Sequence, residues 1–296
     1  MRWYIAILHQ VLRITGHLPL RWLHDIGAAF GWLVWCLHGT PRRRAQVTLS
    51  LALTQISDET RQTLLRRSLI ESGKALLEVA RIWRGDPAAT LALVREVRGL
   101  ELFDKALTTE RGVIIAAPHL GCWELLNFWL CSRTPIAIVY RPPRQTALEP
   151  LLLKARGTLA AEQVRADGAG VRKLYKRLNA GGVVGILPDQ QPRRGEGEFA
   201  PFFDTPALTM VLLPRLAQRT GAQVLFAFAE RLPRGSGYRI HILPAPEEIA
   251  AADLPTAVAA LNRGVENCVR IAPDQYQWSY KRYSIRPQGE PPRRIY

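Results

Sequence analysis

Short apolar runs alternate with longer segments of helical periodicity over most of this chain. Runs of β-branched and aromatic residues bounded by turn residues predict strands at 112–118, 136–140, 183–187, 224–228 and 238–243. Apolar residues recur at helical spacing in segments 57–83, 120–130, 148–159, 171–178, 208–220 and 255–271. The alternation predicts an α/β fold with a mixed, largely parallel sheet flanked by helices. Chemistry in such folds lies at the carboxyl ends of the strands.

Local signals define the start of one helix and one long connection. Ser57 is a predicted N-cap, and Asp58 and Glu59 suit the first turn of the helix that follows. Residues 189–205 form the longest stretch that lacks both the helical and the strand period. Connections of this length are typically functional or disordered, so a loop is predicted here.

The N-terminal 40 residues have a different pattern. Residues 3–37 are rich in Trp, Leu and Ile but also carry charged side chains, and the longest uncharged stretch, 26–41, is too short for a membrane span of about 20 residues. No small-residue cleavage site follows, so a removable signal peptide is not expected. The pattern favours one or two helices in the bilayer interface, with residues 42–44, all Arg, keeping the rest of the chain in the cytoplasm. The alternative is a soluble helical hairpin packed on the core.

These patterns predict two parts: a membrane-anchoring helical segment at 1–40 and a catalytic domain at 41–296. The formal net charge of +15 indicates anionic partners, which are nucleic acid, an acidic membrane surface, or acidic substrates and carrier proteins. Composition does not separate these three. The four cysteines form no CxxC pair and have no metal-like spacing with histidine, so we expect reduced, buried thiols and no metal.

Candidate chemistry lies in the segment 118–124 (PHLGCWE), directly after the first predicted strand. With His119 in the turn and Glu124 in the first turn of the following helix, the two side chains can meet. Gly121 permits the tight bend, and the helix N-terminus favours an ionised carboxylate. We therefore expect Glu124 to hold one imidazole nitrogen of His119 while the other takes a proton from an alcohol or amine. The alternative is a structural histidine at a strand end beside a helix-capping acid.

The sequence offers no second nucleophile. It contains no GxSxG motif, and Cys122 lies on the predicted buried side of the helix. Direct attack of an acceptor hydroxyl on an activated acyl group, such as a thioester, is the simpler hypothesis. No Walker A, GxGxxG or EF-hand motif occurs, so phosphoryl transfer and dinucleotide chemistry have no support, and no cofactor is expected.

Segment 118–124 resembles the HxxxxE variant of the HxxxxD motif found in the lipid A biosynthesis lauroyl and myristoyl acyltransferases. The resemblance continues over nearly the whole chain, in the blocks 140–142 (YRP), 156–157 (RG), 187–190 (LPDQ), 199–203 (FAPFF) and 273–278 (PDQYQW). It implies a sandwich fold like that of the glycerolipid acyltransferases. By the same similarity, Arg156 and Asp189 join His119 and Glu124 as functional positions, and Arg141 and Gln190 are expected to bind substrate.

The resemblance also implies a reaction. A fatty acyl chain passes from acyl carrier protein to the hydroxyl of a 3-hydroxyacyl chain on a Kdo-bearing lipid A precursor, at the cytoplasmic face of the inner membrane of a Gram-negative bacterium. Both the carrier protein and this phosphorylated lipid are acidic, which agrees with the basic charge, and nucleic acid is not an expected partner. Arg141, Arg144, Arg156, Arg193 and Arg194 are candidates for phosphate or carboxylate contacts.

Two other hypotheses stay open. The chain could be an acyltransferase acting on another acceptor, such as a lysophospholipid, a glycolipid or an aminolipid. It could also be a basic, non-enzymatic protein that binds anionic membranes or nucleic acid, in which case His119 would be dispensable. Acyl chain length depends on the side chains that close an apolar groove, and the sequence does not identify them.

Overall fold

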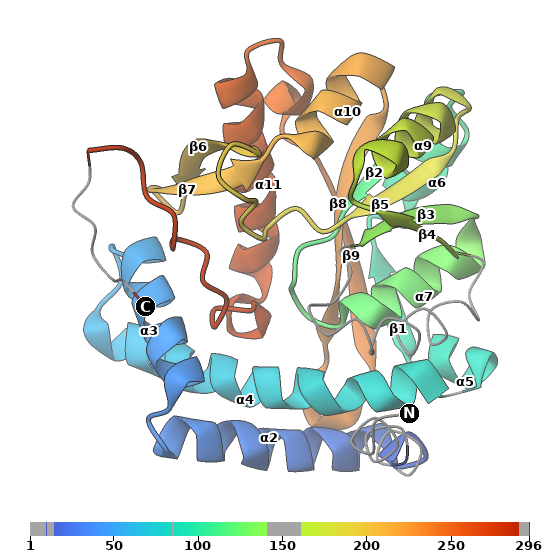
Figure 1. The fold of residues 1–296 in the computed structure, drawn as a ribbon. Helices are drawn as coiled ribbons and strands as arrows, with labels where there is room; N and C mark the ends of the chain where they lie inside the picture. Colours follow the sequence, from blue (N-terminus) through green and yellow to red (C-terminus); the bar gives the residue numbers. More distant parts are fainter. Residues whose placement is uncertain (1–9, 11–14, 85, 141–160, 290–295) are drawn as a thin grey trace.

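The structure, a computed structural model, describes residues 10, 15–84, 86–140, 161–289 and 296. Its centre is a seven-stranded sheet with helices on both faces (Figure 1). The predicted helix at 148–159 lies outside the described residues, as do Arg141 and Arg156.

The strand order in the sheet is β1-β9-β8-β2-β5-β3-β4. All neighbouring pairs are parallel except β8 and β9, which are antiparallel. The sheet is thus mixed and largely parallel, as predicted. The strands are β1 (Val94–Arg98), β2 (Val113–Ala116), β3 (Ile136–Tyr140), β4 (Ala161–Arg165), β5 (Val183–Ile186), β8 (Gln223–Arg231) and β9 (Tyr238–Pro244).

Both faces of the sheet are buried, because helices cover each of them. Ile114 and Ala116 of β2 belong to one apolar core, and Val113 and Ile115, with the opposite orientation, belong to the other. The first core includes side chains of α9 (Gly168–Asn179), α10 (Leu212–Thr220) and α11 (Leu254–Ile271). The second includes side chains of α6 (Leu100–Leu107) and α7 (Trp123–Arg133). Continuous apolar strands are what a sheet buried on two sides requires.

Helices from the first third of the chain lie at one side of the sheet. They are α2 (Leu20–Cys36), α3 (Thr40–Ala52), α4 (Asp58–Arg84) and the short α5 (Pro87–Leu91). α2 and α4 run side by side (Figure 1) and approach closely at glycines: a Cβ on Gly73 would lie 2.0 Å from the carbonyl oxygen of Gly27. The predicted N-cap of α4 is confirmed, since the Ser57 hydroxyl accepts a hydrogen bond from the Thr60 amide at 3.2 Å.

The face of α2 turned away from α4 carries large apolar side chains in solvent. They recur every three or four residues along one stripe: Trp22, Ile26, Phe30, Leu33 and Leu37, all 45% exposed or more. The opposite face buries Leu20, Leu23 and His24. Across the described residues, none of the helices has the length and hydropathy that a transmembrane span requires.

The structure corrects the predictions for 189–205 and 208–220. The end of the predicted loop and the start of the predicted helix form an antiparallel hairpin of β6 (Gly197–Phe202) and β7 (Thr205–Met210), whereas the rest of the predicted helix is confirmed as α10. The hairpin turn places Phe203 and Asp204 at φ values of 47° and 66°. Such turns ordinarily use glycine, asparagine or aspartate, and a phenylalanine at the first position is not a recognisable turn signal. The edge strands β1 and β4 were missed because their exposed charged residues mask the strand pattern.

Candidate active site

A tight turn after β2 carries His119 to the carboxyl end of the sheet. Gly121 in this turn has a φ of +63°, and a Cβ there would lie 2.0 Å from the carbonyl oxygen of Ala229. Both the left-handed backbone and the close approach of β8 therefore require glycine. The helix α7 begins two residues later, at Trp123.

Backbone hydrogen bonds from two distant segments hold this turn. The Gln277 amide donates to the His119 carbonyl at 3.1 Å, and the Gly121 amide donates to the Gln275 carbonyl at 3.2 Å. The Cys122 amide donates to the Ala229 carbonyl at 2.8 Å. The block 273–278, which the sequence singled out without a role, thus fixes the backbone on which His119 stands.

Asp189, at the end of the neighbouring strand β5, orients the imidazole of His119. Its Oδ1 lies 2.8 Å from Nδ1 of His119, and its Oδ2 accepts the His119 backbone amide at 2.9 Å. Burial alone would raise the pKa of Asp189, but the charge and hydrogen bonds of His119 outweigh it and lower the pKa. The carboxylate is therefore ionised at neutral pH and accepts the Nδ1 proton, which leaves the lone pair on Nε2.

Gln190 occupies the position in front of that lone pair. Its side-chain nitrogen lies 3.1 Å from Nε2 of His119, so the amide donates to the imidazole. A substrate hydroxyl that gives its proton to Nε2 must take the place of this amide. The Trp123 ring packs edge-on against the imidazole, with ring centroids 5.3 Å apart, and limits its rotation.

The sequence predicted that Glu124 would contact the imidazole of His119. The structure shows that this prediction is wrong. Both His119 nitrogens have other partners, Asp189 and Gln190, and the buried Glu124 carboxylate accepts the indole N–H of Trp83 at 3.0 Å. The reason is geometric: Glu124 lies in the first turn of α7 and turns back toward α4, whereas Asp189 lies three residues after β5, the strand that pairs with β2.

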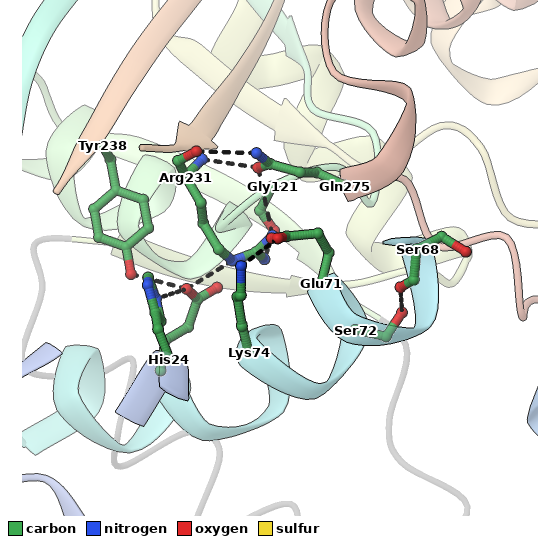
Figure 2. Close-up of polar contacts among 10 residues, drawn as sticks. His24, Ser68, Glu71, Ser72, Lys74, Gly121, Arg231, Tyr238 and Gln275 are labelled. Carbon is green, nitrogen blue, oxygen red and sulfur yellow. Dashed lines mark hydrogen bonds and ion pairs between the residues drawn. The ribbon is translucent and has the colours of Figure 1, made fainter. Parts of the chain in front are cut away.

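A cluster of charged residues is hydrogen-bonded to the turn through Arg231. Figure 2 shows the Arg231 guanidinium beside Gly121, Gln275 and Glu71. Arg231 donates to the Gly121 carbonyl at 2.7 Å and to Oε2 of Glu78 at 2.8 Å. The same Glu78 oxygen accepts the Tyr238 hydroxyl at 2.8 Å and lies 3.1 Å from Nε2 of His24, on α2.

The opposite charges of Glu78 and Arg231 pair with each other, and both residues are buried. Burial alone would raise the pKa of Glu78, but Arg231 and the hydrogen bonds from it and from His24 lower the pKa to about 2. Arg231 was not predicted as a structural or functional residue, because a single arginine at the end of an apolar strand belongs to no recognisable motif. Its side-chain hydrogen bonds go to residues 44 to 160 positions away.

A cavity of about 570 Å³ opens beside His119, over the carboxyl ends of β2, β3, β4 and β5. This volume is in the range of ligand-binding pockets. Polar side chains line part of the cavity, namely His119, Asn127, Gln190, Glu196, Arg215 and Arg219. The apolar part includes Trp123, Ile138, Val139, Tyr175, Ile186, Leu187, Met210 and Leu212. A histidine base at one part of an apolar cavity suits a substrate with a hydrocarbon chain and a reactive group at its end.

Asn127, one helical turn after Trp123, also lines the cavity and is 4% exposed. Its side-chain nitrogen has no hydrogen-bond partner within the part of the chain that the structure describes. A buried amide without a partner costs about 1–3 kcal/mol, and it is unusual in a folded protein. Asn127 was not predicted as a site residue, because a single asparagine in an apolar helix forms no motif.

Four of the six predicted site residues can be located. The structure brings His119, Asp189 and Gln190 together. Glu124 is hydrogen-bonded to Trp83 instead of His119. Arg141 and Arg156 lie outside the described residues. Arg193 and Arg194 are exposed in the connection that follows Gln190.

The fold and the site define an α/β enzyme in which a histidine and an aspartate, at the ends of adjacent parallel strands, face an apolar cavity. The chain belongs to the bacterial lipid A biosynthesis acyltransferase family, whose model matches residues 1–284, and it is an acyltransferase. It is 28% identical to the lipid A biosynthesis lauroyltransferase of Escherichia coli, over 96% of this chain and 92% of that protein.

Two other relatives extend the comparison. The lipid A biosynthesis palmitoleoyltransferase of Escherichia coli is 28% identical, over 92% of this chain and 94% of that protein. The phosphatidylinositol mannoside acyltransferase of Mycobacterium tuberculosis is 26% identical, over 81% of this chain and 75% of that protein. Acyl transfer onto a lipid A precursor is the activity that the family supports.

Proposed function

We propose that this enzyme transfers a fatty acyl chain from acyl carrier protein to the hydroxyl of a 3-hydroxyacyl chain on a Kdo-bearing lipid A precursor. The observation that carries the proposal is the His119–Asp189 pair facing an apolar cavity. The cavity receives the hydrocarbon chain, and the thioester carbonyl lies beside the histidine. The names of the family and its relatives support the acceptor class.

His119 acts as the general base. Once the acceptor hydroxyl replaces the Gln190 amide, Nε2 takes its proton while the oxygen attacks the thioester carbonyl carbon. Asp189 stabilises the imidazolium that forms. When the tetrahedral intermediate collapses, the carbon–sulfur bond breaks, and the imidazolium returns its proton to the thiolate. The products are an ester and the free thiol of the carrier, with no acyl-enzyme intermediate.

Glu124 has a supporting role in this proposal. Its carboxylate, fixed by Trp83, contributes negative charge at the start of α7, close to the histidine turn. Arg141 and Arg156 are proposed to bind the anionic lipid, as the family resemblance implied.

The enzyme is proposed to work at the cytoplasmic face of the inner membrane, with α2 in the bilayer interface. The exposed stripe on α2 offers aromatic and aliphatic side chains, and Arg43, beside the end of that helix, suits anionic headgroups. Trp22→Ser combined with Phe30→Ser should reduce co-flotation with vesicles of phosphatidylethanolamine and phosphatidylglycerol. Unchanged flotation of a folded variant would assign the anchor to another surface.

A related acyltransferase activity on another lipid acceptor is the second candidate, because one of the relatives acts on a phosphatidylinositol mannoside. Mass spectrometry of total lipids from cells with and without this protein distinguishes the two. Lipid A that lacks one acyl chain in the cells without the protein would support the proposal. Unchanged lipid A with the loss of an acyl group from another lipid would support the second candidate.

A further inference from the structure

Two helices beside the cavity carry an unbalanced positive charge. α9 contains Arg172, Lys173, Lys176 and Arg177, α10 contains Arg215 and Arg219, and neither helix contains an acidic residue. Lys173 and Arg177 lie within ion-pair distance of Glu162. The other four cations have no ion-pair partner among the residues that the structure describes.

Two of these four cations line the cavity, and the other two are next in sequence to residues of α9 that line it. Arg215 and Arg219 line the cavity and are exposed, so the cavity reaches the surface beside them. They are four residues apart and lie on the same face of α10. Arg172 and Lys176, also exposed and four residues apart, follow the cavity-lining Val171 and Tyr175 on α9. We call Arg172, Lys176, Arg215 and Arg219 the basic rim.

The basic rim lies far from the apolar stripe of α2. In Figure 1, α9 and α10 lie at the top of the molecule and α2 lies at the bottom, with the sheet between them. A lipid acceptor held at the α2 side would keep its headgroup away from the basic rim. An anionic partner that arrives from solution meets the basic rim first.

We propose that the basic rim is the docking site for acyl carrier protein, an acidic protein that presents its acyl chain on a thioester arm. This inference rests on the proposed donor. The carrier binds across α9 and α10, and its arm delivers the acyl chain past Arg215 and Arg219 into the cavity. Glu196, which also lines the cavity, is one carboxylate against four cations. Opposite charges across such an interface mainly raise the association rate and the specificity.

The test measures KM for two donors that carry the same acyl chain, acyl carrier protein and pantetheine alone. Arg215→Glu combined with Arg219→Glu should raise KM for the protein donor at least about tenfold at low salt, because like charges then face the carrier. KM for acyl-pantetheine should change much less, since that donor brings no acidic protein. Arg172→Glu combined with Lys176→Glu should show the same selectivity.

The matched control is Lys105→Glu combined with Arg111→Glu. Both residues are exposed, and they precede β2 in the chain. They therefore lie toward the amino end of that strand, whereas the cavity lies at the carboxyl ends of the strands. This variant undergoes the same change of charge and should retain the wild-type KM for both donors. The wild-type KM for the protein donor should rise with salt, and the KM of the Arg215/Arg219 variant should be less salt-dependent.

Equal KM values for the Arg215/Arg219 variant and the control would overturn the docking site while leaving the proposed function intact. A raised KM for the lipid acceptor alone would assign the basic rim to the acceptor headgroup instead. A wild-type enzyme that uses acyl-pantetheine but not acyl carrier protein would overturn the proposed donor, and the docking site with it.

Discussion

The turn that carries His119 separates two polar regions, which differ in how far their polar groups are paired. On one side, Glu78 and Arg231 are 1% and 4% exposed, and the Arg231 guanidinium binds Glu78, Glu71 and the Gly121 carbonyl. On the other side, the His119 side chain is 14% exposed and the Asn127 nitrogen has no partner among the described residues.

The difference shows which region holds the fold and which one receives a ligand. The Glu78–Arg231 cluster satisfies its charges internally, so removal of one member leaves a buried charge unpaired. The cavity side retains a replaceable contact at Gln190 and an unused donor at Asn127. Substitutions should therefore affect mainly stability in the first region and mainly catalysis in the second.

Asp189→Asn should give the largest effect on catalysis, a loss of about 10²- to 10⁴-fold in kcat with little change in KM. An amide no longer selects the Nδ1-protonated imidazole or stabilises the imidazolium. Steady-state kinetics with acyl carrier protein as donor measure this loss. Glu124→Gln is the control and should lose less, because Glu124 does not contact the imidazole. An inactive Glu124→Gln with an active Asp189→Asn would make Glu124 the orienting acid.

Arg231→Met should lower the free energy of unfolding by about 3–5 kcal/mol, because Glu78 stays charged and buried without its partner. Denaturant unfolding measures this change. A double variant with Glu78→Leu should recover much of the loss. Arg239→Met, which removes a partly exposed ion pair with Glu96, should cost less than about 1 kcal/mol. Equal losses for the two arginines would remove the distinction between the buried cluster and a surface pair.

Acid should destabilise the protein through Glu78. Its pKa is lowered from 4.5 to about 2 in the folded state, so its contribution is complete above pH 4.5 and is lost as the pH falls toward 2. The shift corresponds to roughly 3 kcal/mol. Unfolding free energies between pH 6 and pH 2 should fall less steeply for Glu78→Gln than for the wild type. Asp189, whose pKa is also lowered, acts in the same direction. Parallel curves for wild type and Glu78→Gln would contradict this account.

Asn127→Leu should have the smallest effect, with opposite signs for stability and activity. Removal of the unpaired amide should leave stability unchanged or raise it by about 1 kcal/mol, while loss of a donor to the bound acyl group should lower kcat/KM about tenfold. Thermal unfolding and kinetics on the same sample measure both. Thr90→Val is the control: Thr90 is buried and its hydroxyl has no partner in the described part of the chain, but it does not line the cavity. A destabilised Asn127→Leu with wild-type kinetics would show a purely structural asparagine.

Features that depend on local periodicity and short motifs could be predicted from the amino-acid sequence. Apolar runs predicted β2, β3, β5, β8 and β9, and Ser57 marked the start of α4, because burial and capping leave their pattern within a few residues. His119 was selected in the same way, from a turn between a strand and a helix.

Contacts between groups far apart in the chain could not be predicted in this way. Asp189 reaches His119 across 70 positions because β5 pairs with β2, and spacing along the chain had favoured Glu124 instead. Arg231 reaches Gly121 across 110 positions. The positive φ of Phe203 has a similar origin: its amide donates to the buried Glu266 at 2.8 Å, a contact that local preference does not contain. Hydrogen bonds and ion pairs between distant segments form only after strand pairing and burial bring them together, so no short window of sequence encodes them.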